Sequence, residues 1–261
     1  MLVGAGPGAP DLLTVRALRA IEGAQALLYD ALVGEEILAL APRPCLRIRT
    51  GKLSGGVSMK QDEINVLMLK LAMRGLTVVR LKGGDPSVFG RCGEERDYLE
   101  ARGVAVAVVP GVTAASAAAA QFGFPLTHRG EARRVTFATA RTHDGSLVEG
   151  GWDAGADPET TLVLYMARDA AGQAADRLMA CGRSPSTPAI AVENAGRKDA
   201  RLVQADLSTL GAVVETAALR GPVLLVIGEV AAKAANRGAS PPSAEGPLPE
   251  YRPRSGYGGF R

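Results

Sequence analysis

The chain has 261 residues, a formal net charge of +3 and a sequence isoelectric point of about 8.9. This length permits one large or two small domains. Because 47% of the residues are hydrophobic but only 4% are aromatic, we expect a core of Ala, Val and Leu. So mild a basic charge does not demand nucleic acid as a partner, and it suits a small polyanionic substrate equally well.

Cysteine and histidine are too few and too scattered to indicate a metal centre. Cys45, Cys92 and Cys181 lie far apart and are odd in number, so neither a disulfide framework nor a zinc site is predicted. The only histidines are His128 and His143. We therefore expect no metal and a reducing, cytoplasmic setting. No apolar run approaches the length that crosses a bilayer, so we expect no membrane contact.

The first half of the chain alternates β-prone runs with amphipathic segments. Strands are predicted at 2–3, 26–29, 45–48, 78–81 and 104–109. Helices are predicted at 11–24, 59–75, 94–103 and 114–123. The first strand is so short that we expect residues to be missing before it. Ser58 and Gln61 fit a capping box for the second helix. Repeated βα units of this kind favour a largely parallel sheet.

The alternation breaks at Phe124-Pro125-Leu126, and we place a domain boundary there. The second half predicts a helix over 170–181 and a mixed sheet with strands at 135–139, 161–166, 189–192, 202–205 and 223–227. From Asn236 the composition turns to Pro, Gly, Ser and Arg, which is typical of a flexible tail. The predicted fold is therefore α/β, with an N-terminal domain over 1–123, a C-terminal domain over 124–235 and a tail over 236–261.

The most informative stretch is VVRLKGGDPSVFGRCGEE, residues 78–95. Its strand ends at Gly83-Gly84, Asp85-Pro86 turns the chain, and Arg91 precedes Glu94-Glu95, which suit the first turn of a helix. Ligands of open α/β sheets bind at this end of the strands. Paired glycines let backbone approach a ligand closely, and a carboxylate can hold a hydroxyl or ammonium group. From spacing alone, an ordinary βα loop is an equal alternative.

The first glycine-rich loop favours a different function. Residues 4–9 match G-x-G-x-x-A between a strand and a helix, and Asp30 closes the next strand, where dinucleotide folds place a ribose-binding acid. An NAD(P)-dependent oxidoreductase is therefore an alternative. Against it, Pro7 and Pro10 remove N–H donors from a loop that has to bind pyrophosphate. Asp30 also follows the first glycine by about 26 residues instead of the usual ~20.

Several stretches taken together are more specific. They are VGAGPGAPDLLTVRA, LLYDALV, GK in TGKLSGG, QDEINVLM, VVRLKGGDPSVFGRCGEE, VVPGVTAASAAAAQFGFPLTHR, TLVLYM and PVLLVIGEV, spread over residues 2–232. In this combination the sequence resembles the uroporphyrinogen-III C-methyltransferases of the tetrapyrrole methylase family. RLKGGDPSVFGR followed by PLTHR carries most of the specificity.

The resemblance implies two α/β domains with the cofactor in the cleft between them, and a homodimer. It implies transfer of two methyl groups from S-adenosylmethionine (SAM) to C-2 and C-7 of uroporphyrinogen III. The product would be precorrin-2, from which sirohaem, cobalamin and haem d1 are made. The implied partners are small molecules, with no nucleic acid and no membrane. Methylation of a later precorrin and tetrapyrrole carriage without methyl transfer stay open as alternatives.

The resemblance also implies roles for single residues. Asp30 matches the proposed proton acceptor and Lys52 the proposed donor, while Arg91, Glu94 and Arg129 match substrate-binding positions. In some members of the family, the position that Arg91 matches has been assigned as the base. Because arginine stays protonated in nearly all settings, we prefer Asp30 as the base and Arg91 as an anchor. The implied cofactor contacts are Pro7, Gly83, Gly84, Asp85, Val88, Thr113, Ala114, Met166 and Ala195.

Overall fold

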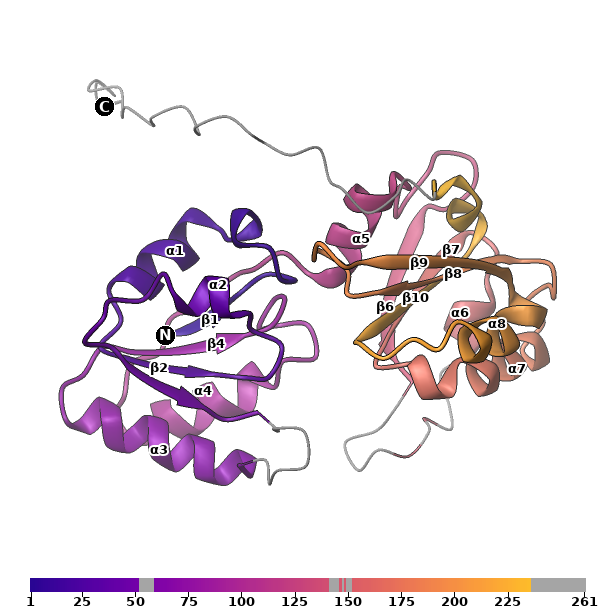
Figure 1. The fold of residues 1–261 in the computed structure, drawn as a ribbon. Coiled ribbons are helices and arrows are strands. Elements are labelled where there is room, and N and C mark those ends of the chain that lie inside the picture. The colour runs from indigo at the N-terminus through magenta and orange to yellow at the C-terminus, as the bar shows by residue number, and fades with distance from the viewer. Residues whose placement is uncertain (52–58, 141–145, 147, 149–151, 236–261) are drawn as a thin grey trace, which may run out of the picture.

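Two α/β lobes, each with its own sheet, make up the computed structural model of the chain (Figure 1). The structure describes residues 1–51, 59–140, 146, 148 and 152–235. The predicted tail, Lys52 and Ser58 therefore lie outside the described residues. The expected fold class is confirmed, since one sheet is parallel and the other is mixed.

The first sheet has the strand order β3-β2-β4-β1-β5, and all four pairings are parallel. Because its strands are parallel, their carboxyl ends all lie at one edge. The strands are β1 (Leu2–Gly4), β2 (Ala26–Tyr29), β3 (Leu46–Arg49), β4 (Val78–Lys82) and β5 (Val108–Val109).

Helices cover both faces of the first sheet (Figure 1). On one face, α1 (Val15–Glu22) and α2 (Glu35–Leu38) pack with Leu27 in a core rich in Ala and Leu. On the other, α3 (Gln61–Met73) and α4 (Cys92–Glu100) pack with Leu28. Alternate residues of β2 thus serve opposite cores, as expected of a strand buried on both faces.

Two helices begin later than their sequences predict. The first segment forms a 3₁₀ turn, η1 (Pro10–Leu12), and α1 starts only after Thr14, whose Oγ1 accepts the backbone N–H of Ala17 at 3.1 Å. In α3 the Glu63 carboxylate accepts the backbone N–H of Lys60 at 2.8 Å. The helix is therefore capped at Lys60, two residues after the predicted Ser58.

The second sheet has the order β6-β7-β10-β8-β9, in which only the β6–β7 pair is parallel. Its strands are β6 (Arg134–Thr139), β7 (Thr160–Tyr165), β8 (Pro188–Glu193), β9 (Arg201–Asp206) and β10 (Val223–Ile227). Its remaining elements are α5 (Ala114–Phe122), α6 (Asp153–Ala156), η2 (Arg168–Ala170), α7 (Ala171–Ala180), η3 (Leu207–Thr209), α8 (Leu210–Thr216) and η4 (Glu229–Lys233).

Both faces of the second sheet are also covered. One face packs against α7 and α8 around Leu178 and Leu225. The other packs against η4 and against α5, whose Ala118 and Phe122 meet Ile190 of β8. Helix α5 follows directly on the last strand of the first sheet, so it forms the described link between the lobes. The boundary at residue 124 stays a prediction.

Two glycines, Gly4 and Gly111, let the strand ends of the first sheet approach one another. A Cβ on Gly4, at the end of β1, would lie 2.6 Å from Gly111 Cα and 2.8 Å from the Gly84 carbonyl oxygen. A Cβ on Gly111, just after β5, would overlap that same oxygen and lie 2.9 Å from Gly4 Cα. The obstacles are backbone atoms, which cannot rotate away as a side chain does. Only glycine therefore fits this crossing.

Replacing Gly111 with Ala should lower the free energy of unfolding by about 3 kcal/mol, because the added methyl group forces backbone apart. Urea denaturation followed by circular dichroism measures the change. Gly93→Ala in α4 is the control, since a Cβ there meets no atom within 4 Å and helix propensity favours Ala by up to about 1 kcal/mol. Equal stability of both variants would contradict the tight crossing.

Candidate functional site

A cavity of about 350 Å³ lies between the lobes, at the carboxyl ends of β2 and β4. Ligand sites of open α/β sheets occupy this position. The second lobe contributes the end of β7 and the loops around Asn194 and Pro222. The wall consists of Pro7, Asp30, Leu32, Gln61, Arg80, Lys82, Gly83, Gly84, Asp85, Val88, Phe89, Gly90, Arg91, Thr113, Ala114, Tyr165, Met166, Asn194, Ala195, Arg197, Pro222, Val223 and Leu224.

The structure brings most of the sequence-predicted site residues together on this wall. Glu94 is not part of it and reaches the cavity only through its partner Arg91. Arg129 is exposed and lies outside the wall, so its substrate contact stays a prediction. Lys52 lies outside the described residues. The predicted residues on the wall are Pro7, Asp30, Gly83, Gly84, Asp85, Val88, Arg91, Thr113, Ala114, Met166 and Ala195.

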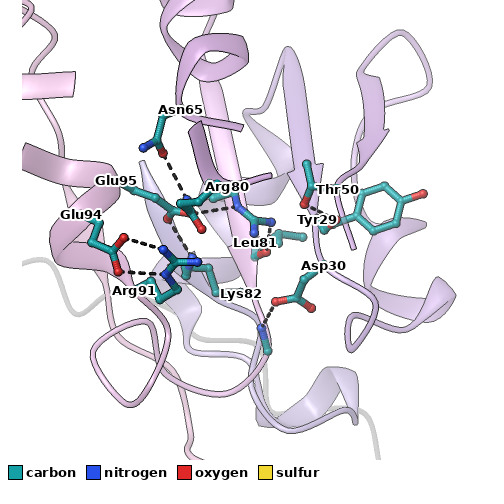
Figure 2. Close-up of polar contacts among 12 residues, drawn as sticks. Tyr29, Asp30, Thr50, Asn65, Arg80, Leu81, Lys82, Arg91, Glu94 and Glu95 are labelled. Carbon is teal, nitrogen blue, oxygen red and sulfur yellow. Dashed lines mark hydrogen bonds and ion pairs between the residues drawn. The ribbon is translucent and has the colours of Figure 1, made fainter. Parts of the chain in front are cut away.

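Asp30 joins the ends of two strands through its carboxylate. Its Oδ1 accepts the backbone N–H of Leu32 at 2.9 Å. Its Oδ2 accepts the backbone N–H of Gly83 at 3.0 Å, the bond drawn from Asp30 in Figure 2. The carboxylate is thus fixed in orientation at the cavity wall. Because each oxygen keeps lone pairs beyond these bonds, the group can still accept a proton from a bound molecule.

Asp85 shapes the cavity by holding two loops. Its Oδ1 accepts the backbone N–H of Ser87 at 2.7 Å and also the Ser87 hydroxyl, while its Oδ2 accepts the N–H of Gly111 at 2.9 Å. Burial opposes ionisation of Asp85, but the hydrogen bonds from Ser87 and Gly111 outweigh it and hold the pKa of Asp85 below its ordinary value. The carboxylate is therefore charged and already engaged with the protein.

Arg91 and Glu94 form a two-pronged ion pair at the entrance to α4. Arg91 Nε and Nη2 donate to the two Glu94 oxygens at 2.8 and 2.6 Å (Figure 2). The bond to Glu94 raises the pKa of Arg91 above its ordinary value. A guanidinium that keeps its proton is a better carboxylate anchor than base, which favours the anchor role.

Strained backbone gathers at the cavity. Four of its wall residues adopt left-handed conformations without being glycine: Phe89, Arg91, Met166 and Asn194, with φ between 53° and 56°. Such residues cost about 1–3 kcal/mol each and concentrate at ligand sites.

Tyr165 is a wall residue that the sequence interpretation missed. Its hydroxyl shares a hydrogen bond with Thr113 Oγ1, and its ring packs edge-on or tilted against Phe137 and Phe89, with centroids 5.8 and 5.2 Å away. Burial raises the pKa of Tyr165 above its ordinary value, so the phenol stays neutral. Its position in TLVLYM, directly before the implied cofactor contact Met166, could have indicated that Tyr165 lies at the site.

A buried charge cluster on α3, β4 and α4 was also missed. Glu95 is fully buried and accepts hydrogen bonds from Lys82 Nζ at 2.8 Å, Gln61 Nε2 at 3.1 Å and Arg80 Nε at 3.4 Å (Figure 2). Three of these residues, Gln61, Arg80 and Lys82, also line the cavity. The sequence interpretation had placed Glu95 in a helix first turn and assigned no role to the two cations.

The glycine-rich loop has little left with which to bind a pyrophosphate. The N–H groups of Ala5, Gly6 and Ala9 donate to the carbonyls of Lys82, Gly84 and Gly196, at 2.8, 3.2 and 2.9 Å. Pro7 has no N–H to offer. In addition, the first turn of α1 is capped by its own Thr14. The loop therefore joins the lobes, and three of the N–H groups that a dinucleotide site would use are already bonded within the protein.

Comparison with known proteins identifies the family. The sequence model described as Tetrapyrrole (Corrin/Porphyrin) Methylases matches residues 1–211. The chain belongs to the tetrapyrrole methylases. Membership agrees with the two-sheet architecture and with a cavity between the lobes.

Individual tetrapyrrole methylases are similar over most of this chain. Siroheme synthase of Methylococcus capsulatus is 47% identical over 88% of the chain, and a chloroplastic S-adenosyl-L-methionine-dependent uroporphyrinogen III methyltransferase of Arabidopsis thaliana is 46% identical over 88%. The matches cover 48% and 62% of those relatives, so the chain spans about half to two thirds of their length.

One solved structure aligns with this chain over nearly its whole length. Uroporphyrin-III C-methyl transferase of Thermus thermophilus, complexed with S-adenyl homocysteine, superposes with a TM-score of 0.76 at 41% identity. The alignment covers 88% of this chain and 96% of that one.

In the part of the chain that the structure describes, no helix combines the length and apolar character needed to cross a membrane. Nor do three or more His, Cys, Asp or Glu side chains gather there as metal ligands would.

Glu193 should make stability depend on pH. It is buried and accepts the N–H groups of Arg220 and Gly221 at 2.5 and 2.6 Å, which fixes the turn before the Pro222 wall segment. Burial raises the pKa of Glu193, but these bonds and Arg201 outweigh it and leave the pKa below 4.5. A depressed folded-state pKa gives stability that is present above the unfolded value and is lost as pH falls through the folded one.

Glu193→Gln should therefore be about 1–3 kcal/mol less stable than the parent at pH 7, and the difference should shrink as pH falls below 4.5. Urea titrations at pH 7, 5 and 3.5 measure this. Glu36→Gln is the control, because that side chain is 65% exposed and its Lys198 partner is 3.7 Å away. A difference between parent and Glu193→Gln that is independent of pH would rule out the linkage.

Proposed function

We propose that this chain is a SAM-dependent uroporphyrinogen-III C-methyltransferase, which methylates C-2 and C-7 and yields precorrin-2. One observation carries the proposal: all nine implied cofactor contacts lie on the wall of one cavity between the lobes, together with Asp30 and Arg91. A Thermus thermophilus protein named uroporphyrin-III C-methyl transferase and complexed with S-adenyl homocysteine supports the proposal. It is 41% identical to this chain, and the alignment covers 96% of the Thermus thermophilus protein.

The cavity wall suits SAM better than a dinucleotide. Gly83 and Gly84 expose backbone, and Val88, Ala114 and Ala195 supply apolar surface. Three N–H groups of the glycine loop already donate to carbonyls of the protein. SAM has no phosphate, so it does not need those donors. When bound, it supplies a methyl group on a sulfonium whose departure leaves a neutral thioether, and no acid is needed there.

The chain's own residues would position the macrocycle and move its protons. Arg91, kept protonated by Glu94, anchors a substrate carboxylate. Asp30, held by the N–H groups of Leu32 and Gly83, accepts the proton that leaves the methylated macrocycle. Holding the pyrrole carbon in line with the methyl group supplies a large part of the rate enhancement.

The proposal extends to assembly and setting. The family resemblance supports a homodimer with small-molecule partners, and the scattered cysteines support a cytoplasmic location. Sirohaem, cobalamin or haem d1 synthesis would use the product. The siroheme synthases that resemble this chain are about twice as long, and their further activities are not assigned to it.

Anaerobic incubation with SAM and uroporphyrinogen III, followed by mass spectrometry of the pigment, tests the proposal. The expected result is a gain of two methyl groups. Methyl transfer only to a later precorrin would identify a different methylase of the family. Macrocycle binding without methyl gain would identify a carrier, and binding of NADPH but not S-adenosylhomocysteine would favour an oxidoreductase.

A further inference from the structure

The buried cluster of Arg80, Lys82 and Glu95 joins two cations to one carboxylate. All three side chains are at most 6% exposed. Burying charge is unfavourable unless each group is paired and its hydrogen bonds are made. Desolvation, together with the neighbouring Arg80, lowers the pKa of Lys82 despite the attraction of Glu95 and Asp30. The cluster is therefore incompletely compensated at the place where it meets the cavity.

Lys82 has hydrogen bonds to spare. Its ammonium carries three donors, and within the described residues it donates only to Glu95 Oε2, at 2.8 Å. Arg80 likewise donates through Nε to Glu95 and through Nη1 to the carbonyl of Leu81, while its Nη2 meets no acceptor in the described chain. Since both side chains line the cavity, a molecule bound there can supply the acceptors that the described residues do not.

The position of Lys82 matches the chemistry of the proposed substrate. Lys82 directly precedes Gly83 and Gly84, the implied cofactor contacts, and Asp30 accepts the N–H of Gly83. Its ammonium is held by Glu95, and it is close enough to Asp30 for that carboxylate to oppose the lowering of the Lys82 pKa, so it lies near the proposed base. In uroporphyrinogen III the carbons that receive the methyl groups, C-2 and C-7, each carry an acetate. A reacting carbon near Gly83 thus brings a carboxylate with it.

We infer that Lys82, with Arg80 beside it, binds the acetate carboxylate on the reacting pyrrole ring, and that Glu95 is the positioning residue that holds both cations. The inference rests on the proposed function. Arg91 at the rim would anchor a different carboxylate of the same macrocycle. Lys82 is then a specificity residue, because it selects substrates that carry an acetate where the methyl group is added.

Two porphyrins and one nucleoside test the inference. Uroporphyrin III and coproporphyrin III share four propionates, but coproporphyrin III has methyl groups in place of the acetates. Dissociation constants for both, and for S-adenosylhomocysteine, are measured with the parent and Lys82→Met. We expect Lys82→Met to weaken uroporphyrin III binding about tenfold or more, as befits a lost charge-assisted hydrogen bond. Coproporphyrin III and S-adenosylhomocysteine should change less than about threefold.

Controls separate binding from folding. Glu95 keeps Arg80 and Gln61 in Lys82→Met, so the variant should fold. Should it not fold, Lys82→Gln gives the same comparison. Lys82→Arg should retain most of the preference for uroporphyrin III. Lys198→Met, at a side chain that is 90% exposed, should leave all three constants unchanged.

The outcomes are distinct. Equal weakening for the two porphyrins, or no change for either, overturns the inference. Weakening confined to S-adenosylhomocysteine would assign Lys82 to the cofactor's own carboxylate and also overturns it. If the parent protein binds no porphyrin at all, the proposed function fails, and the inference that rests on it is overturned with it.

Discussion

Asp30→Asn should lower turnover with SAM and uroporphyrinogen III by about 10²–10⁴-fold, the usual contribution of a positioned base. The amide is nearly isosteric but cannot take up a proton at neutral pH. Its single carbonyl oxygen can still accept one of the two N–H groups, from Leu32 or Gly83, that the carboxylate accepts now. S-adenosylhomocysteine affinity should therefore fall less than about tenfold, the equivalent of one neutral hydrogen bond.

Single-turnover methyl transfer and calorimetry measure the two quantities separately. Asp157→Asn is a matched control: its carboxylate also accepts a backbone N–H two residues later, at 2.9 Å, but it lies away from the cavity. That variant should turn over like the parent. Parallel losses of turnover and cofactor affinity in Asp30→Asn would show that Asp30 holds the loops and does no proton transfer.

Glu95→Ala should lower the free energy of unfolding by about 3–5 kcal/mol, because it leaves Arg80 and Lys82 buried beside each other without a counter-charge. The neighbouring Glu94→Ala removes a pair whose side chains are both 55% exposed, and it should cost less than about 1 kcal/mol. The two substituted residues are neighbours in sequence, but the side chain of Glu95 is buried and that of Glu94 is exposed.

Urea denaturation of both variants in the same buffer tests the contrast. Repeating it in 1 M NaCl adds a second criterion, because salt screens exposed pairs far more than buried ones. The loss in Glu95→Ala should be almost unchanged by salt. Two similar losses, or a Glu95→Ala loss that salt abolishes, would mean that Glu95 behaves as a surface charge.

The strands of the first lobe follow from local sequence, and their arrangement does not. Val78, Val79 and Leu81 form a β-prone run, and the paired glycines after it mark its end. The order β3-β2-β4-β1-β5 depends on contacts between segments far apart in the chain. No short-range pattern encodes them. Similarly, the sequence predicted Thr14 inside a helix, whereas the chain forms a 3₁₀ turn at Pro10–Leu12 and α1 begins only after Thr14.

The candidate site shows the same division. Paired glycines and a following Asp predicted a ligand loop at residues 83–85, and the family resemblance supplied the residues that face it across the cavity. Lys82, Glu95 and Tyr165 were missed because nothing in a linear pattern says whether a charged or phenolic side chain will be buried. Their roles appear only when two helices and the second lobe pack against the strand ends.

The two sheets are also contiguous in sequence: the strands of the first lie within residues 2–109, and those of the second within 134–227. Neither lobe borrows a strand from the other, so the backbone passes between them a single time across the described residues. Each lobe's share of the cavity wall therefore comes from its own continuous part of the sequence. Exchanging the segment after α5 between homologues would replace wall residues such as Tyr165 and Met166, and it would leave the parallel sheet with Asp30 and Lys82 intact.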